Sequence, residues 1–366
     1  MSLPLTCIVK SLPPVVPFVG PEALERRNGR PFQVRVGANE SPFGVSPTAA
    51  ESMRRAVGEL WMYNDPEAHD LTARLADEHG VRYGEISVGA GIDDLLGVLV
   101  RIFAEPGAPI VTSLGSYPTF NYHVAGYGAC LEEVPYVDDH ANPVALVERV
   151  CRCAAPLIYL ANPDNPMGTW LPAQVVGEIL DGLPEQTVLI LDEAYVDFAP
   201  PEAIPEIVTD DLRLIRARTF SKAHGMAGAR IGYLIAHAEV VSAIDRVRNQ
   251  FGVNRVAQAG ALASLDDGEH MRHVVGEVES GRTELVALAE ELGLNHVDSA
   301  TNFVNIDMGS GDRARATLAG LLERDVFVRM PTRPPGDRCI RVTVGISDQR
   351  RLFAEALRSV VAEQGY

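Results

Sequence analysis

Short apolar segments that alternate with helical stretches constrain the fold of this chain more than any other feature. A strand, a helix and a second strand in this order predict a mostly parallel sheet with helices on both faces. The chain has 366 residues, 46% of them apolar, so it can bury the core that such a sheet needs. The strand-like segments behind this prediction are residues 129–134, 157–161, 187–191, 213–218 and 231–236.

Polar side chains follow three of these segments, at the sheet edge where open α/β sheets bind ligands. Asp192 and Tyr195 come directly after the third segment. Asn165 lies in a proline-rich turn after the second, and Lys222 follows the fourth. Taken alone, a strand that ends in Asp-Glu also suits a metal or nucleotide site, and a proline-rich turn is often a plain loop.

Lys222 indicates a more specific chemistry. Among the 32 basic residues only Lys10 and Lys222 are lysines. A lysine among arginines suggests a group that must lose its proton and attack a carbonyl carbon. Ser221 and Arg230 beside it offer a hydroxyl and a fork of donors suited to a phosphate. An aldehyde that carries a phosphate describes pyridoxal phosphate.

These motifs, in this order, resemble the fold-type I pyridoxal-phosphate enzymes, and among them the histidinol-phosphate aminotransferase group. Three more stretches agree: Gly-Ala-Asn-Glu-Ser-Pro-Phe-Gly near the start, Tyr-Asn-Asp-Pro-Glu at 63–67 and Ile-Arg-Val-Thr-Val-Gly near the end. The resemblance covers nearly the whole chain. It implies a three-layer α/β fold, with an N-terminal arm over residues 1–40, a large cofactor-binding domain over 41–285 and a small α+β domain over 286–366.

The resemblance also implies the catalytic roles. Lys222 would hold the cofactor and move the substrate's α-proton as general base and general acid. Asp192 would keep the ring nitrogen protonated, while Tyr195 would hold the ring oxygen together with Asn165. Phe120 would stack on the ring face, a role that needs only its π system.

A phosphate site follows from the same resemblance. The Gly-x-Gly turn before the expected helix would present backbone amides to the phosphate, because amides at a helix N-terminus lack partners. Tyr63 would reach the phosphate of the partner subunit, which predicts a homodimer with shared active sites. The residues implied to bind the cofactor are Ala90, Gly91, Ile92, Phe120, Asn165, Asp192, Tyr195, Ser221, Lys222, Arg230 and Tyr63.

The substrate is less constrained than the cofactor. The resemblance places Asn39 in a substrate-side loop, Arg341 at the α-carboxylate and Arg329 at the substrate's distal end. Two departures, Gly37 for a common asparagine and Phe18 for a frequent tyrosine, remove polar groups that a phosphorylated substrate would use. Three hypotheses therefore stay open. The first is an aminotransferase acting between histidinol phosphate or an amino acid, aromatic ones included, and 2-oxoglutarate. The second is a decarboxylase of the phosphothreonine type, and the third is a non-catalytic binding protein.

Charge and composition exclude other classes of partner. The formal net charge of −17 argues against nucleic acids and anionic membranes. There is no apolar run of about 18 residues and no signal-peptide pattern, so we expect a cytoplasmic protein. The five cysteines have no regular spacing, and neither a second cysteine pair nor a histidine pair completes a zinc pattern, so we expect no metal.

Overall fold

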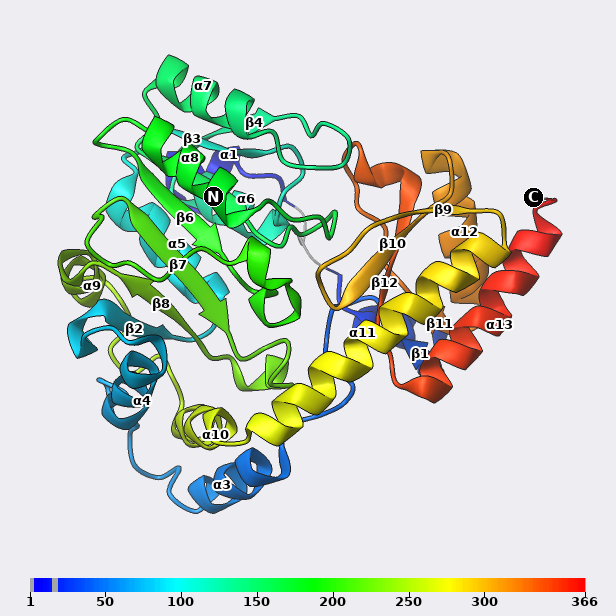
Figure 1. Cartoon of the computed structure of the whole chain (residues 1–366), viewed down its shortest axis with the longest axis horizontal. Helices are drawn as coiled ribbons and strands as arrows, with labels where there is room; N and C mark the ends of the chain where they lie inside the picture. Colours follow the sequence, from blue (N-terminus) through cyan, green and yellow to red (C-terminus); the bar gives the residue numbers. More distant parts are fainter. Residues whose placement is uncertain (1–2, 15–18, 366) are drawn as a thin grey trace.

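A computed structural model describes residues 3–14 and 19–365 and contains a large domain and a small one (Figure 1). The large domain is built on a seven-stranded sheet with the order β2-β8-β7-β6-β5-β3-β4. Its strands are parallel except β8, which is antiparallel to both neighbours. The strands are β2 (Ile86–Gly89), β3 (Pro109–Ser113), β4 (Cys130–Val134), β5 (Leu157–Ala161), β6 (Val188–Asp192), β7 (Leu214–Thr219) and β8 (Gly232–Ala236).

Helices cover both faces of this sheet, which confirms the predicted three layers. On one face α5 (Ile92–Phe103), α6 (Pro118–Gly126) and α9 (Ala238–Asp245) pack against the strands. On the other face lie α7 (Pro143–Cys153) and α8 (Ala173–Gly182). Every residue of β5 and of β6 is buried, which explains why these strands read as continuous apolar runs in the sequence.

Further helices surround the edge of the sheet that β2 forms. α4 (His69–His79) and α10 (Arg255–Leu265) share a buried cluster with β2 and β8, and α3 (Pro47–Val57) packs on α10. Short 3-10 turns are η1 (Tyr83–Glu85), η2 (Val196–Phe198), η3 (Pro201–Ala203), η4 (Ala227–Ala229) and η5 (Gly336–Arg338).

A buried ion network stands behind the carboxyl end of β6. The Glu193 carboxylate accepts hydrogen bonds from Arg216 at 2.6 and 3.0 Å and from Arg218 at 2.8 Å. Burial would raise the pKa of Glu193, but the charges of the two arginines lower it. Arg216 also donates to the carbonyls of Pro205 and Glu206 at 2.9 Å. Because removing one partner of such a network leaves buried charge uncompensated, the network fixes the chain next to Asp192.

The segment from about 237 to 291 consists of the helices α9, α10 and α11 (Gly268–Glu291). The side chains of Asn254 and Asp267 accept backbone N–H groups and start two new helices, α10 and α11. In Figure 1, α11 runs from the large domain to the small one. It therefore connects the part of the molecule that holds the seven-stranded sheet with the part that holds the three-stranded sheet.

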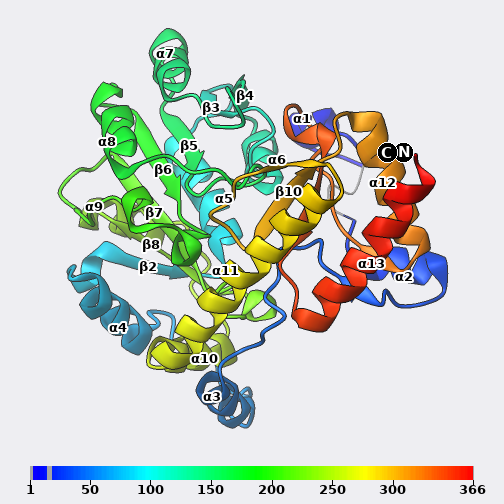
Figure 2. The same cartoon turned by 45° about the vertical axis from the view of Figure 1, so that its right-hand side comes forward.

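The small domain is α+β. An antiparallel sheet with the order β12-β10-β9 packs against α11 and shares its core with α12 and α13. Part of the arm joins this domain, because β1 pairs in parallel with β11 (Figure 1). Figure 2 shows α2, another part of the arm, on the same side of the molecule as α12 and α13. The remaining elements are α1 (Cys7–Ser11), α2 (Pro21–Asn28), β1 (Val34–Arg35), β9 (Asn295–Val297), β10 (Phe303–Asp307), α12 (Gly311–Glu323), β11 (Val326–Phe327), β12 (Cys339–Thr343) and α13 (Ser347–Glu363). Within residues 3–14 and 19–365, no helix has the length and apolar character needed to span a membrane.

Candidate active site

One cavity of about 640 Å³ lies at the carboxyl edge of the large sheet and is closed by residues of the small domain. It is lined by Ala38, Asn39, Glu40, Ile92, Tyr117, Tyr159, Asn165, Asp192, Tyr195, Ser221, Lys222, Arg230, Arg329 and Arg341, among others. The structure thus brings together most of the site residues predicted from the sequence, although they are spread over three hundred positions of the chain.

Lys222 lies inside this cavity, just after β7. Its Nζ donates a hydrogen bond to the Asn39 carbonyl at 2.9 Å and lies 5.5 Å from the centre of the Tyr195 ring. Burial, together with the nearby charge of Arg341, lowers the pKa of Lys222 to about 8. An amine with this pKa is neutral in a substantial fraction of molecules near neutral pH, as a nucleophile requires.

The turn after Lys222 has no room for a side chain at Gly225. Gly225 has a φ of +69°, and a Cβ atom there would collide with the Gly44 carbonyl. The backbone that carries Lys222 therefore lies directly against the loop that carries Asn39. This close approach is possible only with glycine.

Asp192 ends β6 at the floor of the cavity. Its carboxylate accepts hydrogen bonds from the Tyr159 hydroxyl at 2.7 Å and the Ala194 backbone amide at 2.9 Å. Burial raises the pKa of Asp192 to about 6, although these two bonds oppose the shift. Asp192 is therefore mostly ionised at neutral pH and can accept a hydrogen bond from a protonated ring nitrogen.

Tyr195 and Asn165 lie beside Lys222, on the small-domain side of the cavity. The Tyr195 oxygen accepts hydrogen bonds from the amide nitrogens of Asn39 at 2.9 Å and Asn165 at 3.4 Å. Burial raises the pKa of Tyr195 well above its ordinary value, so its hydroxyl keeps its proton at neutral pH. The hydroxyl group is thus available as a hydrogen-bond donor.

Ser221 and Arg230 form a cationic corner with the start of α5. Arg230 donates to the Ser221 hydroxyl at 3.4 Å, and Ile92, the first residue of α5, lines the cavity beside them. Gly91 has a φ of +91°, and a Cβ atom there would collide with the Arg230 guanidinium. A side chain at position 91 would therefore displace the arginine from the helix start.

Ala90 does not fit its predicted role as a phosphate ligand. Its backbone amide already donates to the Asp94 carboxylate at 3.1 Å, and the Gly91 amide donates to the Gly89 carbonyl at 2.8 Å. Neither residue lines the cavity, whereas Ile92 does. The amide donors of this turn that face the cavity thus begin at Ile92.

The prediction for Phe120 is wrong. Its side chain is 0% exposed and stacks on the inner side of Tyr159, with ring centres 4.4 Å apart, in the core below α5. Tyr117, at the N-cap of α6, lines the cavity instead. Phe120 lies inside α6 with its side chain in the core, whereas Tyr117, the N-cap residue, is the aromatic residue of this motif that reaches the cavity.

Two arginines of the small domain line the cavity side by side. Arg341 on β12 donates to the Asn165 side-chain oxygen at 2.7 Å, and its backbone pairs with that of Arg329. Burial lowers the pKa of Arg341, and it lowers that of Arg329 to about 10 with the help of Arg341. No acidic side chain pairs with Arg341 in the described residues, and its Nε has no hydrogen-bond partner there. Such a group is suited to bind an anion from solution.

The remaining predicted residues lie elsewhere. Tyr63 is 81% exposed and does not line the cavity of its own chain; its ring lies 5.0 Å from that of Phe251. Gly37 packs against the Phe327 ring, which a Cβ atom would approach to 2.7 Å, so an asparagine would not fit there. Phe18 lies outside the described residues.

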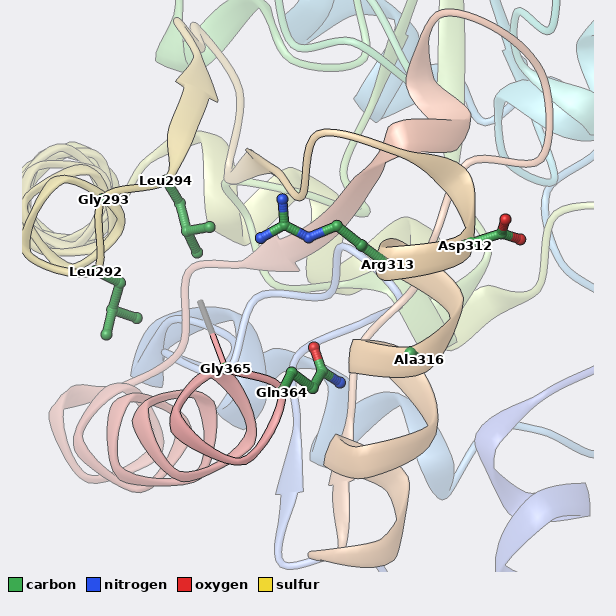
Figure 3. A pocket seen from close by; sticks show the side chains of 8 residues that line it. All are labelled: Leu292, Gly293, Leu294, Asp312, Arg313, Ala316, Gln364 and Gly365. Carbon is green, nitrogen blue, oxygen red and sulfur yellow. The ribbon is translucent and has the colours of Figure 1, made fainter.

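A second hollow of about 870 Å³ lies in the small domain, away from these groups. Figure 3 shows it between the turn after α11, the start of α12 and the end of α13, with the Arg313 side chain directed into it and the Asp312 side chain turned away. Lys222, Asp192 and Tyr195 do not line this hollow, whereas all three line the first cavity. The first cavity is therefore the candidate active site.

Several residues of the site were not predicted from the sequence. Tyr159 had a usable signal, because a tyrosine in the otherwise apolar strand β5 needs a partner for its hydroxyl. Tyr117 stood in the motif that was assigned to Phe120. Thr343, which bonds to Asn39, had no such signal, because the two residues are 304 positions apart.

Comparisons with known proteins give a consistent result. A family model described as aminotransferase class I and II matches residues 32–357. Histidinol-phosphate aminotransferase 2 of Pseudomonas fluorescens is 33% identical over 333 residues, with 90% of this chain and 89% of the relative covered. Histidinol-phosphate aminotransferase of a Geobacillus species is 30% identical over 361 residues, with 97% and 98% covered. A crystal structure of histidinol-phosphate aminotransferase from Sinorhizobium meliloti, in complex with pyridoxal-5'-phosphate, has 46% sequence identity and a TM-score of 0.97, with 100% of this chain and 99% of that chain covered.

Proposed function

Because this chain belongs to the family of class I and II aminotransferases, we propose that it is a pyridoxal-phosphate-dependent aminotransferase of the histidinol-phosphate group. It moves an amino group between histidinol phosphate or an amino acid and 2-oxoglutarate. The observation that supports this most is Lys222, a partly buried lysine with a lowered pKa that shares one cavity with the buried carboxylate of Asp192.

The groups that line the cavity fit pyridoxal phosphate. Ser221, Arg230 and the start of α5 form a corner for a dianionic phosphate, and the missing side chain of Gly91 leaves space for the arginine. Asp192 suits a protonated ring nitrogen, and the Tyr195 hydroxyl suits a ring oxygen. When bound, pyridoxal phosphate supplies an aldehyde for the lysine and a ring that withdraws electrons from the reacting carbon.

The chain's own residues then perform the proton transfer. Lys222 Nζ would take the proton from the substrate's reacting carbon as base and then, as acid, deliver it to a different atom, the former aldehyde carbon of the bound cofactor. Asp192 stays ionised and holds positive charge on the ring nitrogen. Arg341 binds the substrate anion next to the reacting carbon, and Arg329 binds an anion further away. Tyr117 lines the same cavity and supplies an aromatic ring to it.

Two neighbouring arginines suit substrates with anionic groups. 2-Oxoglutarate carries two carboxylates, and histidinol phosphate carries a phosphate, so each can engage this pair. The test is a panel of amino donors with 2-oxoglutarate as acceptor. We expect the highest kcat/KM for histidinol phosphate. A preference for phenylalanine or tyrosine would make the enzyme an aromatic aminotransferase, and release of carbon dioxide from phosphothreonine would make it a decarboxylase.

We also propose a homodimer with shared active sites. Large apolar side chains are exposed together at the end of α3 and near Phe251, where the loop contacts Tyr63: Val57, Leu60, Trp61 and Phe251. Trp61 is 82% exposed, and apolar patches of this kind favour protein interfaces. A two-fold axis would place the same patch on both chains. Tyr63 could then reach only the cavity of the other subunit.

Replacing Tyr63 with alanine tests this arrangement. We expect the affinity for pyridoxal phosphate to fall by about tenfold or more, because a hydrogen bond to a charged group is lost. Cofactor titration of the apoprotein measures the change, and Tyr127→Ala, at another exposed tyrosine, is the control. Sedimentation should give the mass of two chains for wild type. Unchanged affinity, or a fully active monomer, would contradict the shared site.

A further inference from the structure

Asn39 is held in an unusual conformation by the small domain. Its φ is +54°, in the left-handed region, which asparagine tolerates better than most residues. The Asn302 side chain donates to the Asn39 carbonyl at 3.2 Å, the same oxygen that Lys222 contacts. Thr343, the last residue of β12, holds both the backbone and the side chain of Asn39. The loop beside the lysine is therefore positioned from the other domain.

The Thr343 hydroxyl determines which way the Asn39 amide faces. A backbone N–H can only donate, so the Thr343 oxygen accepts from the Asn39 amide nitrogen of the backbone, at 3.0 Å. The hydroxyl hydrogen is then free to donate, and it donates to the Asn39 side-chain oxygen at 3.1 Å. The side-chain nitrogen must therefore face the Tyr195 oxygen, 2.9 Å away.

Asn165 is oriented by the same logic. A guanidinium only donates, so Arg341 fixes the Asn165 oxygen toward itself and the nitrogen toward Tyr195. The Tyr195 oxygen thus accepts two amide donors, and both of its lone pairs are used. Among residues 3–14 and 19–365, no protein acceptor receives the Tyr195 hydroxyl hydrogen. This hydrogen is left for a group bound in the cavity.

We propose that Thr343 is a positioning residue for the reaction: by orienting Asn39 it keeps two donors on Tyr195 and directs the Tyr195 hydrogen to the bound cofactor. This inference rests on the proposed function. Thr343 itself does not line the cavity, so it acts through Asn39. The arrangement also makes the catalytic hydroxyl dependent on β12 and on the loop before β10, both in the small domain.

The groups around Tyr195 determine whether losing the Thr343 hydroxyl makes the Tyr195 hydroxyl a stronger or a weaker acid. Arg341 and the Asn39 amide favour its ionised form, while burial, Tyr117 and Asp192 oppose it, and the cation of Lys222 faces its ring. Losing the Asn39 donor makes the Tyr195 hydroxyl a weaker acid and a poorer hydrogen-bond donor. A cofactor oxygen that accepts this hydrogen is then less stabilised as an anion. The proton that the bound cofactor shares with this oxygen is therefore lost only at a higher pH.

The test uses Thr343→Val, which keeps the shape of the side chain and removes the hydroxyl. We expect the pH midpoint of the visible absorbance change of the cofactor-loaded protein to rise by about 0.5 to 1 unit, with kcat/KM about tenfold lower. Thr343→Ser keeps the hydroxyl and should restore both values. The matched control is Thr317→Val, which removes another buried small-domain hydroxyl, bonded to Gln364, and should shift neither value.

A double-mutant cycle tests the route through Asn39. In an Asn39→Ala background, Thr343→Val should add almost nothing to the midpoint shift, because the amide it orients is absent. Equal shifts in both backgrounds would overturn the proposal, as would an unchanged midpoint in Thr343→Val. Should the valine variant fail to fold, Asn39→Ala alone must raise the midpoint, and an unchanged value sinks the idea. A wild-type protein that takes up no pyridoxal phosphate would instead refute the proposed function.

Discussion

Replacing Lys222 with alanine is expected to reduce kcat for amino transfer by about 10⁴-fold, because the same nitrogen holds the cofactor and moves the substrate proton. The variant should still fold, since in the described part of the chain Lys222 forms one hydrogen bond to protein, with the Asn39 carbonyl. It should bind pyridoxal phosphate without a covalent link. Borohydride reduction followed by mass spectrometry measures that link directly, and steady-state kinetics measures the loss of rate.

The chain provides its own control for this experiment. Lys10, the other lysine of the sequence, is exposed in α1. Lys10→Ala should keep full activity and should still be labelled by reduction. Transamination by Lys222→Ala within tenfold of the wild-type rate would show that another group is the nucleophile.

The lowered pKa of Lys222 adds a pH dependence to the same prediction. A free lysine loses its proton near pH 10.5, whereas burial and Arg341 bring the pKa of Lys222 to about 8. The neutral amine, which attacks the aldehyde, is therefore the minor form at pH 7 and the major form above pH 8. Covalent loading of the apoprotein should accelerate with rising pH and level off above about pH 8.

Replacing Asp192 with asparagine is the second change with a large expected effect. Asparagine retains the shape and can still accept from Tyr159 and Ala194, but it carries no charge to keep the ring nitrogen protonated. We expect kcat to fall by about 10²- to 10³-fold, while the covalent link to Lys222 still forms. Stopped-flow measurement of the first half-reaction isolates the proton transfer.

Asp197→Asn is the matched control for this change. Asp197 lies five residues further along, its pKa is also raised to about 6 by burial, and it does not line the cavity. Its variant should keep kcat within a few-fold of wild type. Equal losses in the two variants would mean that Asp192 acts through folding and not through the ring nitrogen.

Predictions from sequence succeeded where one local pattern decides the structure. Continuous apolar runs identified the parallel strands, and the position of Asp192 and Lys222 after two of them placed both groups at one sheet edge. Phe120 was misplaced because an aromatic motif does not reveal which side of a helix faces the core. Ala90 was misplaced because its amide is taken by Asp94, a contact that depends on the exact path of the turn.

The contacts around Tyr195 could not have been predicted in this way. They join loops at positions 39 and 165 to strand β12, and only the packing of the two domains brings them together. Hydrogen bonds between residues so far apart leave no periodic trace in the sequence. These contacts are visible only in the tertiary structure, whereas the role of Lys222 is already indicated by its sequence motif.

The spread of these contacts has a consequence for how the protein is made. Translation supplies the strands of the large sheet, with Asp192 and Lys222, well before it supplies Arg341 and Thr343. A nascent chain can therefore bury its main core while the catalytic hydroxyl still lacks its supports. A product released before β12 is synthesised would lack Arg341 and Thr343, and with them the supports of the Tyr195 hydroxyl.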